Sequence, residues 1–485
     1  MNEHTLQNDH TEHKLHRKLN ARMLNMIAIG GSVGTGIFLA SGGSIAAAGP
    51  GGTLAAYLII GLMVYFLMTS LGEMAAFMPS TGSFYVYASR FVDPALGYAL
   101  GWNYWYNWAI TVASEISAAS LLMHFWLPNS PPIIWSTLFL GIFIAFNAIS
   151  ARGFGEAEYW LSLIKVMTIV VFIIVGTAMI FGLTTHQPVG FKNWTIGDAP
   201  FHGGTLAIFG AFIVAGFSFQ GTELIGVAAG ESEDPGKTIP KAIKQVFWRI
   251  LLFFVLSIVI ISTLIPYTSP ELLSGNVSVS PFTIIFEKIG ITFAASLMNA
   301  VILTAVLSAG NSGMYAASRM LWYMAKAGHA PRIFSKVNHR GIPIFALLAT
   351  ILVAGVTFLS SLFGNGAVYF WLLNASSLCG FIAWAGIAIS HYRFRKAYIK
   401  QGRDLKALPY VAKGYPYAPL IAFGLCVIIL GGQNYQAIMS TPTNWTGIFI
   451  SYLGLPLFLS LWLGYKFLRK TKVVPLSECQ FDHQD

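Results

Sequence analysis

Charged side chains are scarce in this sequence of 485 residues. Asp, Glu, Lys and Arg make up only 10% of it, hydrophobic residues make up 55%, and the mean hydropathy is +0.64. A soluble protein of this size needs a charged surface around its core, and 19 acidic with 29 basic side chains are too few to supply one. The composition therefore predicts a protein that lies within a lipid bilayer.

The sequence also lacks the patterns of metal sites and enzymes. Its three cysteines, Cys379, Cys426 and Cys479, show no spacing typical of a metal site or a disulfide framework. No nucleophile, base and orienting residue share a recognisable spacing. The net charge of +10 does not indicate nucleic-acid binding, because basic residues of membrane proteins collect in cytoplasmic loops. We therefore expect no enzyme activity, no metal, no cofactor and no nucleic acid.

Long apolar runs recur along the whole chain. About 20 apolar residues suffice to cross the hydrocarbon of a bilayer. Twelve such runs predict about twelve transmembrane helices, at 23–48, 53–78, 95–126, 132–150, 157–183, 203–231, 241–266, 292–320, 343–363, 367–390, 416–439 and 445–468. An even number of spans places both termini on the same side of the membrane.

The basic residues indicate which side that is. With the N-terminus in the cytoplasm, every Lys and Arg lies in a cytoplasmic segment or at its helix ends except Lys165, Lys192 and Lys288. The polar N-terminus is not followed by a short apolar segment with a cleavage site. We predict a cytoplasmic tail over 1–22, a transmembrane domain over 23–468 and a cytoplasmic tail over 469–485, in the cell inner membrane.

Glycine interrupts two of the predicted helices near mid-membrane. The first span has four glycines among the seven residues from Gly30 to Gly36, and the sixth contains the run Gly216 to Glu223. Unwound backbone within a membrane must line a cavity enclosed by protein, and paired interruptions in two halves of a chain indicate a midplane site of a transporter. Close helix packing is the alternative explanation for the glycines.

The two interruptions suit the charged ends of an amino acid. Half-helix N-termini carry partial positive charge and the preceding C-termini partial negative charge, which match a carboxylate and an ammonium group. The candidate substrate-binding residues at the two breaks are Ser32, Val33, Gly34, Thr35, Gly36, Phe217, Ser218 and Phe219. Asn311, in a small polar stretch of the eighth span, is a further candidate, although such stretches also join helices.

Three ionisable residues lie well inside predicted spans, where each costs about 2.5–3.5 kcal/mol on insertion scales. Glu115 is a candidate to neutralise Lys165 or to hold the distal cation of a basic substrate, and a purely structural ion pair is equally compatible. Lys165 is expected either to face the bundle or to extend past Glu158 to the cytoplasmic surface. Glu223 follows the second break, and we expect it to take up a proton when the cavity closes.

Two acidic residues lie near cytoplasmic helix ends. Glu231 is either a gate or coupling residue or a solvated helix-end acid. Glu73 is expected at the membrane interface and outside the site.

Three segments carry a resemblance to a known family. Ile27–Gly36, Gly101–Trp108 and Gly216–Gly226 resemble amino-acid permeases of the amino acid-polyamine-organocation superfamily. Bacterial lysine-specific permeases are similar in three further segments, Ala229–Pro235, Asn299–Tyr315 and Ile389–Arg395. The resemblance covers nearly the whole chain after about residue 17, and relatives for arginine or histidine share much of the pattern.

The resemblance implies an all-α fold of two inverted five-helix repeats plus two C-terminal helices, with helices one and six unwound. It implies a site between spans one, three, six, eight and ten. The loop Ser32–Gly36 is then expected to hold the substrate carboxylate, and Phe217 or Phe219 to gate the site.

The resemblance also implies roles for the charged residues. Lys165 resembles the lysine whose ammonium replaces a sodium ion in proton-coupled relatives. Glu223 and Glu231 look like acids linked to basic-substrate recognition and coupling. Glu115 is a departure, because the nearest lysine permeases carry a shorter Asp there.

These expectations converge on import of L-lysine with protons by alternating access. A cationic lysine and one proton together gain roughly 4.6 kcal/mol per 100 mV of membrane potential. The coupling candidates are Lys165, Glu223 and Glu231. The alternatives are an exchanger of cationic amino acids, a permease for arginine or histidine, and a lysine-binding sensor that signals through a regulatory membrane protein.

Overall fold

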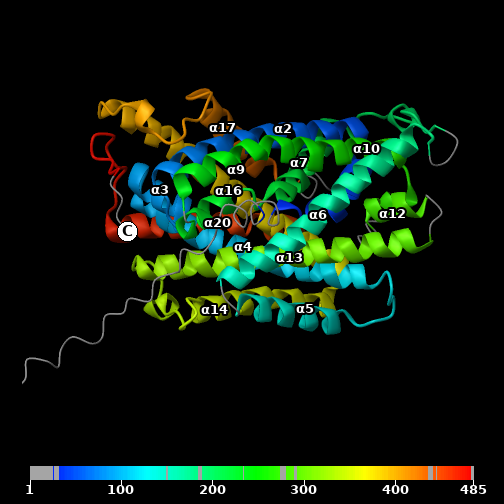
Figure 1. Cartoon of the computed structure of the whole chain (residues 1–485), viewed down its shortest axis with the longest axis horizontal. Coiled ribbons are helices and arrows are strands. Elements are labelled where there is room, and N and C mark those ends of the chain that lie inside the picture. Colours follow the sequence, from blue (N-terminus) through cyan, green and yellow to red (C-terminus); the bar gives the residue numbers. More distant parts are fainter. Residues whose placement is uncertain are drawn as a thin grey trace, which may run out of the picture.

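Helices form the body of the molecule. The computed structural model describes residues 26, 32–148, 151–183, 188–232, 234–273, 280–288, 292–434, 438, 441–443 and 445–481. The long helices α2 (Ser41–Phe77) and α13 (Thr292–Lys326) run along the longest axis, and α6 (Ala151–Ile180) runs obliquely to them in this view (Figure 1). An all-helical architecture is therefore confirmed for the described residues.

The first group of helices begins with the first described helix and ends with the interrupted helix formed by α7 and α8, followed by η3. Its helices are η1 (Gly36–Ala40), α2 (Ser41–Phe77), α3 (Ser83–Phe91), α4 (Pro94–Met123), α5 (Pro132–Asn147), α6 (Ala151–Ile180), η2 (Lys192–Trp194), α7 (Gly204–Phe219), α8 (Leu224–Ala228) and η3 (Ala229–Glu231).

The second group of helices follows η3 along the chain and includes α13 and α16, which are nearly as long as α2. Its helices are α9 (Pro235–Arg249), η4 (Ile250–Val255), α10 (Leu256–Leu264), α11 (Pro270–Leu273), α12 (Pro281–Glu287), α13 (Thr292–Lys326), η5 (Arg332–Ser335), α14 (Ile344–Ala354), η6 (Gly355–Leu359), α15 (Ser360–Phe363), α16 (Asn365–Lys400), η7 (Leu405–Ala407), α17 (Tyr417–Gly432), α19 (Trp445–Tyr452) and α20 (Gly454–Arg469).

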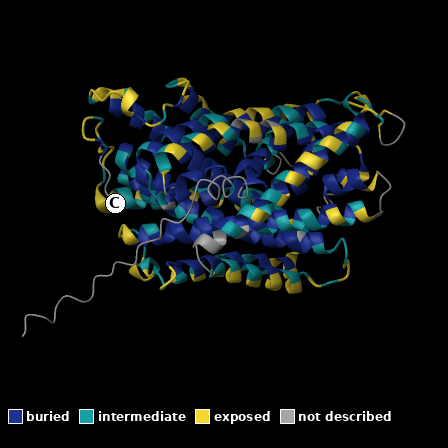
Figure 2. Cartoon of the chain, viewed as in Figure 1, coloured by how far each residue is buried: buried dark blue, intermediate teal, exposed yellow. Residues whose placement is uncertain are grey.

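Six helical stretches of the described residues are long and apolar enough to cross a membrane. They are Gly36–Phe77, Glu158–Ile180, Gly204–Ala228, Phe293–Lys326, Ile344–Phe363 and Gly366–Lys400, and shorter apolar helices cover Pro132–Asn147, Leu252–Leu264 and Tyr417–Gly432. Many large apolar side chains face outward, such as Leu352, which is 81% exposed, and Phe467, which is 76% exposed (Figure 2). This distribution is typical of a multi-pass membrane protein.

A sharp turn divides the stretch Gly36–Phe77. Gly49 has a φ of 71° and a ψ of 175°, and Pro50 follows it. The carbonyl oxygen of Pro200 accepts a hydrogen bond from the Gly51 N–H at 2.8 Å and would lie 2.7 Å from a Cβ placed on Gly49. Only glycine fits this close approach at a positive φ. The turn separates the two runs predicted at 23–48 and 53–78.

The helix α16 continues beyond the apolar run predicted at 367–390. Its last turns, from His391 to Lys400, are polar and remain helical. Arg395 and His391 of this extension face the end of α2 at Glu73. Hydrophobicity therefore predicted the end of this helix too early, because tertiary contacts with α2 stabilise its polar last turns.

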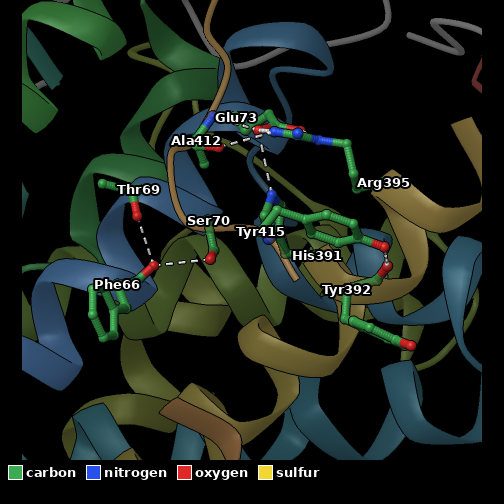
Figure 3. A network of polar contacts seen from close by, with 9 residues as sticks. All are labelled: Phe66, Thr69, Ser70, Glu73, His391, Tyr392, Arg395, Ala412 and Tyr415. Carbon is green, nitrogen blue, oxygen red and sulfur yellow. Dashed lines mark hydrogen bonds and ion pairs between the residues drawn. The ribbon is translucent and has the colours of Figure 1, made fainter. Parts of the chain in front are cut away.

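A buried ion pair joins α2 and α16 (Figure 3). The Glu73 carboxylate, which is 0% exposed, accepts hydrogen bonds from Arg395 Nε at 2.6 Å, from Arg395 Nη2 and from the Ala412 N–H at 2.6 Å. His391 Nε2 lies 3.4 Å from the same carboxylate. Glu73 is therefore buried and not solvated, because Arg395 supplies a partner from a distant part of the sequence; its place at the membrane interface stays a prediction.

The chain returns to the same end of the molecule after α20. Val474 donates its N–H to the Val92 carbonyl at 2.9 Å, and Lys466 pairs with Asp93. Phe481 is 3% exposed and contacts the rings of Phe77 and Phe394. Residues 470–481 are therefore docked against the loop before α4 and the end of α16.

Replacing Arg395 by Met is expected to lower the free energy of unfolding by about 3–5 kcal/mol, because it leaves the buried Glu73 carboxylate without its charged partner. The apparent melting temperature of the purified protein in detergent measures this loss. Lys400→Met is the matched control, since Lys400 is exposed at the end of the same helix. Equal melting temperatures for the two variants would contradict the prediction.

Candidate functional site

The sixth predicted span is interrupted as expected. Helix α7 ends at Phe219 and α8 begins at Leu224. Between them Gln220 has an extended ψ of 145° and Gly221 a φ of 97°. Gly221 therefore occupies a backbone conformation that disfavours other residues. The chain is not helical here although both flanking segments are buried.

Glu223 stabilises this interruption. Its Oε2 accepts hydrogen bonds from the Gly221 N–H at 3.1 Å and from Trp384 Nε1 at 3.3 Å, and its Oε1 accepts one from Tyr104 Oη at 3.3 Å. The side chain is 1% exposed. Three donors from α4, α16 and the break itself thus surround the carboxylate. This arrangement satisfies a backbone group that hydrocarbon would leave unpaired.

The first predicted span approaches this break closely. Residues 27–31, which include Gly30 and Gly31, lie outside the described residues. Val33 and Gly34 form a bend, and the π-helix η1 follows from Gly36. A Cβ on Gly36 would lie 2.6 Å from the Ser218 Cα, so glycine permits contact between the two backbones.

A small cavity lies between the two interruptions. Its lining residues are Ser32, Gly34, Gly36, Trp108, Thr111, Glu115, Phe217, Ser218, Gln220 and Ala309. The space that the centre of a water molecule can reach is about 10 Å³, which holds about one water. The cavity is therefore closed around its polar groups in this conformation, and a substrate requires it to widen.

Glu115 of α4 is the acidic side chain among the residues that line the cavity. Its Oε1 accepts hydrogen bonds from Thr35 Oγ1 at 3.1 Å and from the Thr35 N–H at 3.4 Å. Its Oε2 has no hydrogen-bond partner among the described residues, and the side chain is 3% exposed. The structure thus brings Glu115 to the predicted loop of the first span.

Lys165 faces the interior of the bundle. Its side chain is 0% exposed, which decides between the two orientations considered from the sequence. The carboxylates of Glu158 and Glu115 interact electrostatically with its ammonium group. Lys165 is therefore buried within electrostatic reach of the cavity residue Glu115 and of Glu158, a second buried acid on its own helix.

The other candidate residues occupy three different environments. Phe217 lines the cavity, whereas Phe219 packs against Phe254 with ring centroids 4.2 Å apart. Asn311 is buried in α13, and its Oδ1 accepts a hydrogen bond from Asn147 Nδ2 at 2.7 Å. Neither Asn311 nor Glu223 lines the cavity. Their assignment to the site stays a prediction.

Glu231 and Val33 complete the candidates. Glu231 ends η3, and its side chain lies outside the described part of the structure. Val33 is buried at the bend of the first span but does not line the cavity.

Sequence reasoning missed a polar network beside the cavity. Ser376 Oγ lies 2.6 Å from Thr111 Oγ1, 2.9 Å from Asn107 Oδ1 and 3.0 Å from Gln220 Oε1. Gln220 Nε2 donates to the Ser376 carbonyl at 3.0 Å. Gln220 stands within the glycine-interrupted run, which was a usable signal. Neutral polar residues on α4 and α16 carry no such signal.

A larger hollow lies on the outer side of α6 and α13. Its volume is about 460 Å³, and apolar side chains such as Trp160, Met167 and Leu297 line it. It has no charged lining residue. An amino acid, which carries two charged groups, is therefore matched by the small polar cavity and not by this hollow.

The match to a family model covers residues 24–477 and carries the description "Amino acid permease". The chain belongs to the amino acid permease family. The permease is 59% identical over 475 residues to the lysine-specific permease LysP of Escherichia coli K12, covering 97% of each chain. It is 51% identical to LysP of Lactococcus lactis subsp. cremoris, over 99% of this chain and 95% of the relative.

A histidine permease is also similar. The permease is 47% identical to HisP of Lactococcus lactis subsp. cremoris over 476 residues, which cover 98% of this chain and 99% of the relative. Family membership makes this protein a transporter and not an enzyme. It confirms the resemblance carried by the two glycine-interrupted segments.

Gly36→Ala is expected to lower amino-acid uptake and the melting temperature, because the added methyl group overlaps the Ser218 backbone. Overpacking of this kind costs about 1–3 kcal/mol. Gly43→Ala is the matched control, since nothing lies within 4 Å of a Cβ at Gly43. Uptake into proteoliposomes and thermal unfolding are measured in parallel. Normal uptake by both variants would contradict the close contact of the two breaks.

Proposed function

We propose that this permease imports L-lysine together with a proton by alternating access. Glu115 carries the substrate part of the proposal, because it is a buried carboxylate at a cavity enclosed by two interrupted helices. A free acceptor oxygen at this position suits the side-chain ammonium of lysine. The two similar lysine-specific permeases support the same substrate.

Lys165 supports a proton as the coupling ion. It is a buried ammonium beside two carboxylates, so the three groups can hold or release a proton without entry of a metal cation. Intramembrane ionisable residues commonly mark proton pathways. The resemblance implies the same role for Lys165, and Glu223 and Glu231 remain the further coupling candidates.

The proposed architecture has twelve spans, two inverted five-helix repeats and two C-terminal helices. In this architecture the protein lies in the cell inner membrane, and both of its termini are in the cytoplasm. An inverted five-helix repeat relates the first span to the sixth span. The interruptions near Gly34 and Gly221 lie in these two spans and therefore support the repeat. The distribution of basic residues supports the orientation.

Histidine import is the second candidate function. The similarity to HisP supports it, and the polar network around Ser376 offers neutral hydrogen-bonding groups near the cavity. An imidazole ring lacks the long flexible arm of lysine. Competition between the two amino acids therefore separates the candidates.

The decisive experiment measures uptake of radiolabelled lysine by proteoliposomes that contain no amino acid. With the membrane potential clamped at zero, an inward gradient of one pH unit and one coupled proton predict about tenfold accumulation. A sodium gradient at constant pH is the control. Arginine, ornithine and histidine serve as competitors.

Each result decides one part of the proposal. Accumulation that only close lysine analogues inhibit supports lysine and proton symport. Dependence on sodium, a requirement for internal amino acid, or stronger inhibition by histidine would each refute the corresponding part. A sensor would instead bind a partner protein in response to lysine in a variant that does not transport.

Lys165→Ala is expected to abolish accumulation driven by the pH gradient and to retain lysine binding, because it removes the buried cation between the two carboxylates. Scintillation proximity binding and gradient-driven uptake are compared on the same preparation. Lys192→Ala is the control, since Lys192 is an exposed lysine outside the helical bundle. Normal accumulation by Lys165→Ala would remove Lys165 from the coupling mechanism.

A further inference from the structure

We infer that Glu158 is a proton-transfer residue on the cytoplasmic side of Lys165. The inference deepens the proposed proton symport and rests on it. In this view Glu115, Lys165 and Glu158 form one charge cluster, and the coupled proton leaves the protein through Glu158. No functional role was predicted for Glu158 from the sequence.

The burial of Glu158 is the first observation. Its side chain is 0% exposed although it lies two turns after the first residue of α6. Ser308 of α13 donates a hydrogen bond to Oε1, and Ser162 Oγ lies 3.3 Å from the same oxygen. Oε2 has no hydrogen-bond partner among the described residues. A buried carboxylate with one unsatisfied oxygen can accept a proton without breaking an existing bond.

The position of Glu158 on α6 places it toward Lys165. The two residues are separated by two helical turns, so they share one face of the helix, about 10 Å apart along the axis. Helical side chains lean toward the N-terminus of their helix, which directs the long lysine side chain toward Glu158. The electrostatic interaction of the two groups agrees with this geometry.

The charges of the cluster are unequal. With all three groups ionised, two carboxylates and one ammonium give a formal charge of −1. The other elements around Glu158 present neutral groups, namely Ser308, Asn311 and Ser312 of α13, among the described side chains. One added proton makes the cluster neutral. An uncompensated charge is unfavourable in a low-dielectric interior, so the cluster favours uptake of one proton.

A hydroxyl group links Glu158 to the first span. Ser162 Oγ lies 3.0 Å from the Met26 carbonyl oxygen as well as 3.3 Å from Glu158 Oε1. Its single proton can serve only one of them at a time. Movement of Met26 away from α6 would therefore make this donor available to Glu158 and favour its ionised form.

The transfer conserves protons at each step. In the loaded state the cluster holds one added proton and has no net charge. With lysine bound, Glu115 is the carboxylate that pairs with the substrate ammonium, so the added proton is on Glu158 Oε2 and stays there until lysine departs. Water that enters beside the first span then accepts it, and the cluster returns to a charge of −1.

Glu158→Gln tests the inference in proteoliposomes that carry a pH-sensitive dye inside. We expect lysine-dependent proton uptake and pH-driven accumulation to fall at least about tenfold, because the neutral amide removes the need for the coupled proton. Counterflow of labelled lysine into lysine-loaded vesicles needs no net proton movement and should remain within about twofold of wild type. Glu156→Gln, on the same helix and partly exposed, is the matched control.

A second variant keeps the carboxylate. The hydrogen bond from Ser308 to Oε1 favours the ionised form of Glu158. Ser308→Ala removes this hydrogen bond and therefore favours the protonated form. We therefore expect the internal pH for half-maximal lysine release to rise by about one unit. A purely structural role of Glu158 would change the melting temperature and leave this pH profile in place.

Several outcomes would overturn the inference. Normal coupled proton uptake by Glu158→Gln would do so, as would an unchanged pH profile for Ser308→Ala. Loss of counterflow in a folded Glu158→Gln protein would assign the residue to the transport cycle in general. Absence of lysine-coupled proton uptake in the wild-type protein would instead refute the proposed symport, and the two failures are thus distinguishable.

Discussion

Backbone groups inside a membrane must find partners within the protein, and this constraint governs the centre of the molecule. The stretch between Phe219 and Leu224 leaves the helical path, and Glu223 accepts the Gly221 N–H there. The same carboxylate binds Tyr104 and Trp384, so the break is attached to α4 and α16. Gln220, within the break, and Phe217 and Ser218, just before it, line the cavity. The close approach of Gly36 to Ser218 then places the first span against it.

Hydrophobicity predicted most helices because each apolar run is long and the bilayer demands such runs. The glycine clusters predicted the break at Gly221, where φ is 97°, since few residues adopt that conformation. The sequence offered no comparable signal for the Glu73 and Arg395 pair, whose members are far apart along the chain. The contact between Ser376 and Thr111 was not predicted either, because a neutral polar residue in a helix has no distinctive spacing. Long-range packing decides such contacts.

Two buried groups of charged side chains among the described residues differ in their balance. Glu73 faces Arg395, receives a backbone N–H as well, and joins α2 to α16 (Figure 3). Glu115, Lys165 and Glu158 contain one more acid than base, and one oxygen of each acid has no hydrogen-bond partner among the described residues. A matched pair favours a single arrangement, whereas an unmatched cluster responds to protons. The first suits a structural connection and the second suits a transport cycle.

The docked segment after α20 has a consequence for the order in which the protein is made. Phe481 contacts Phe91, Phe77 and Phe394, and Val474 binds the backbone at Val92. The early helices emerge from the ribosome first, yet this aromatic cluster lacks a member until residue 481 has been translated. The cluster is therefore completed only after α20 has been made. A chain that stops before residue 481 leaves the rings of Phe77 and Phe91 without this contact.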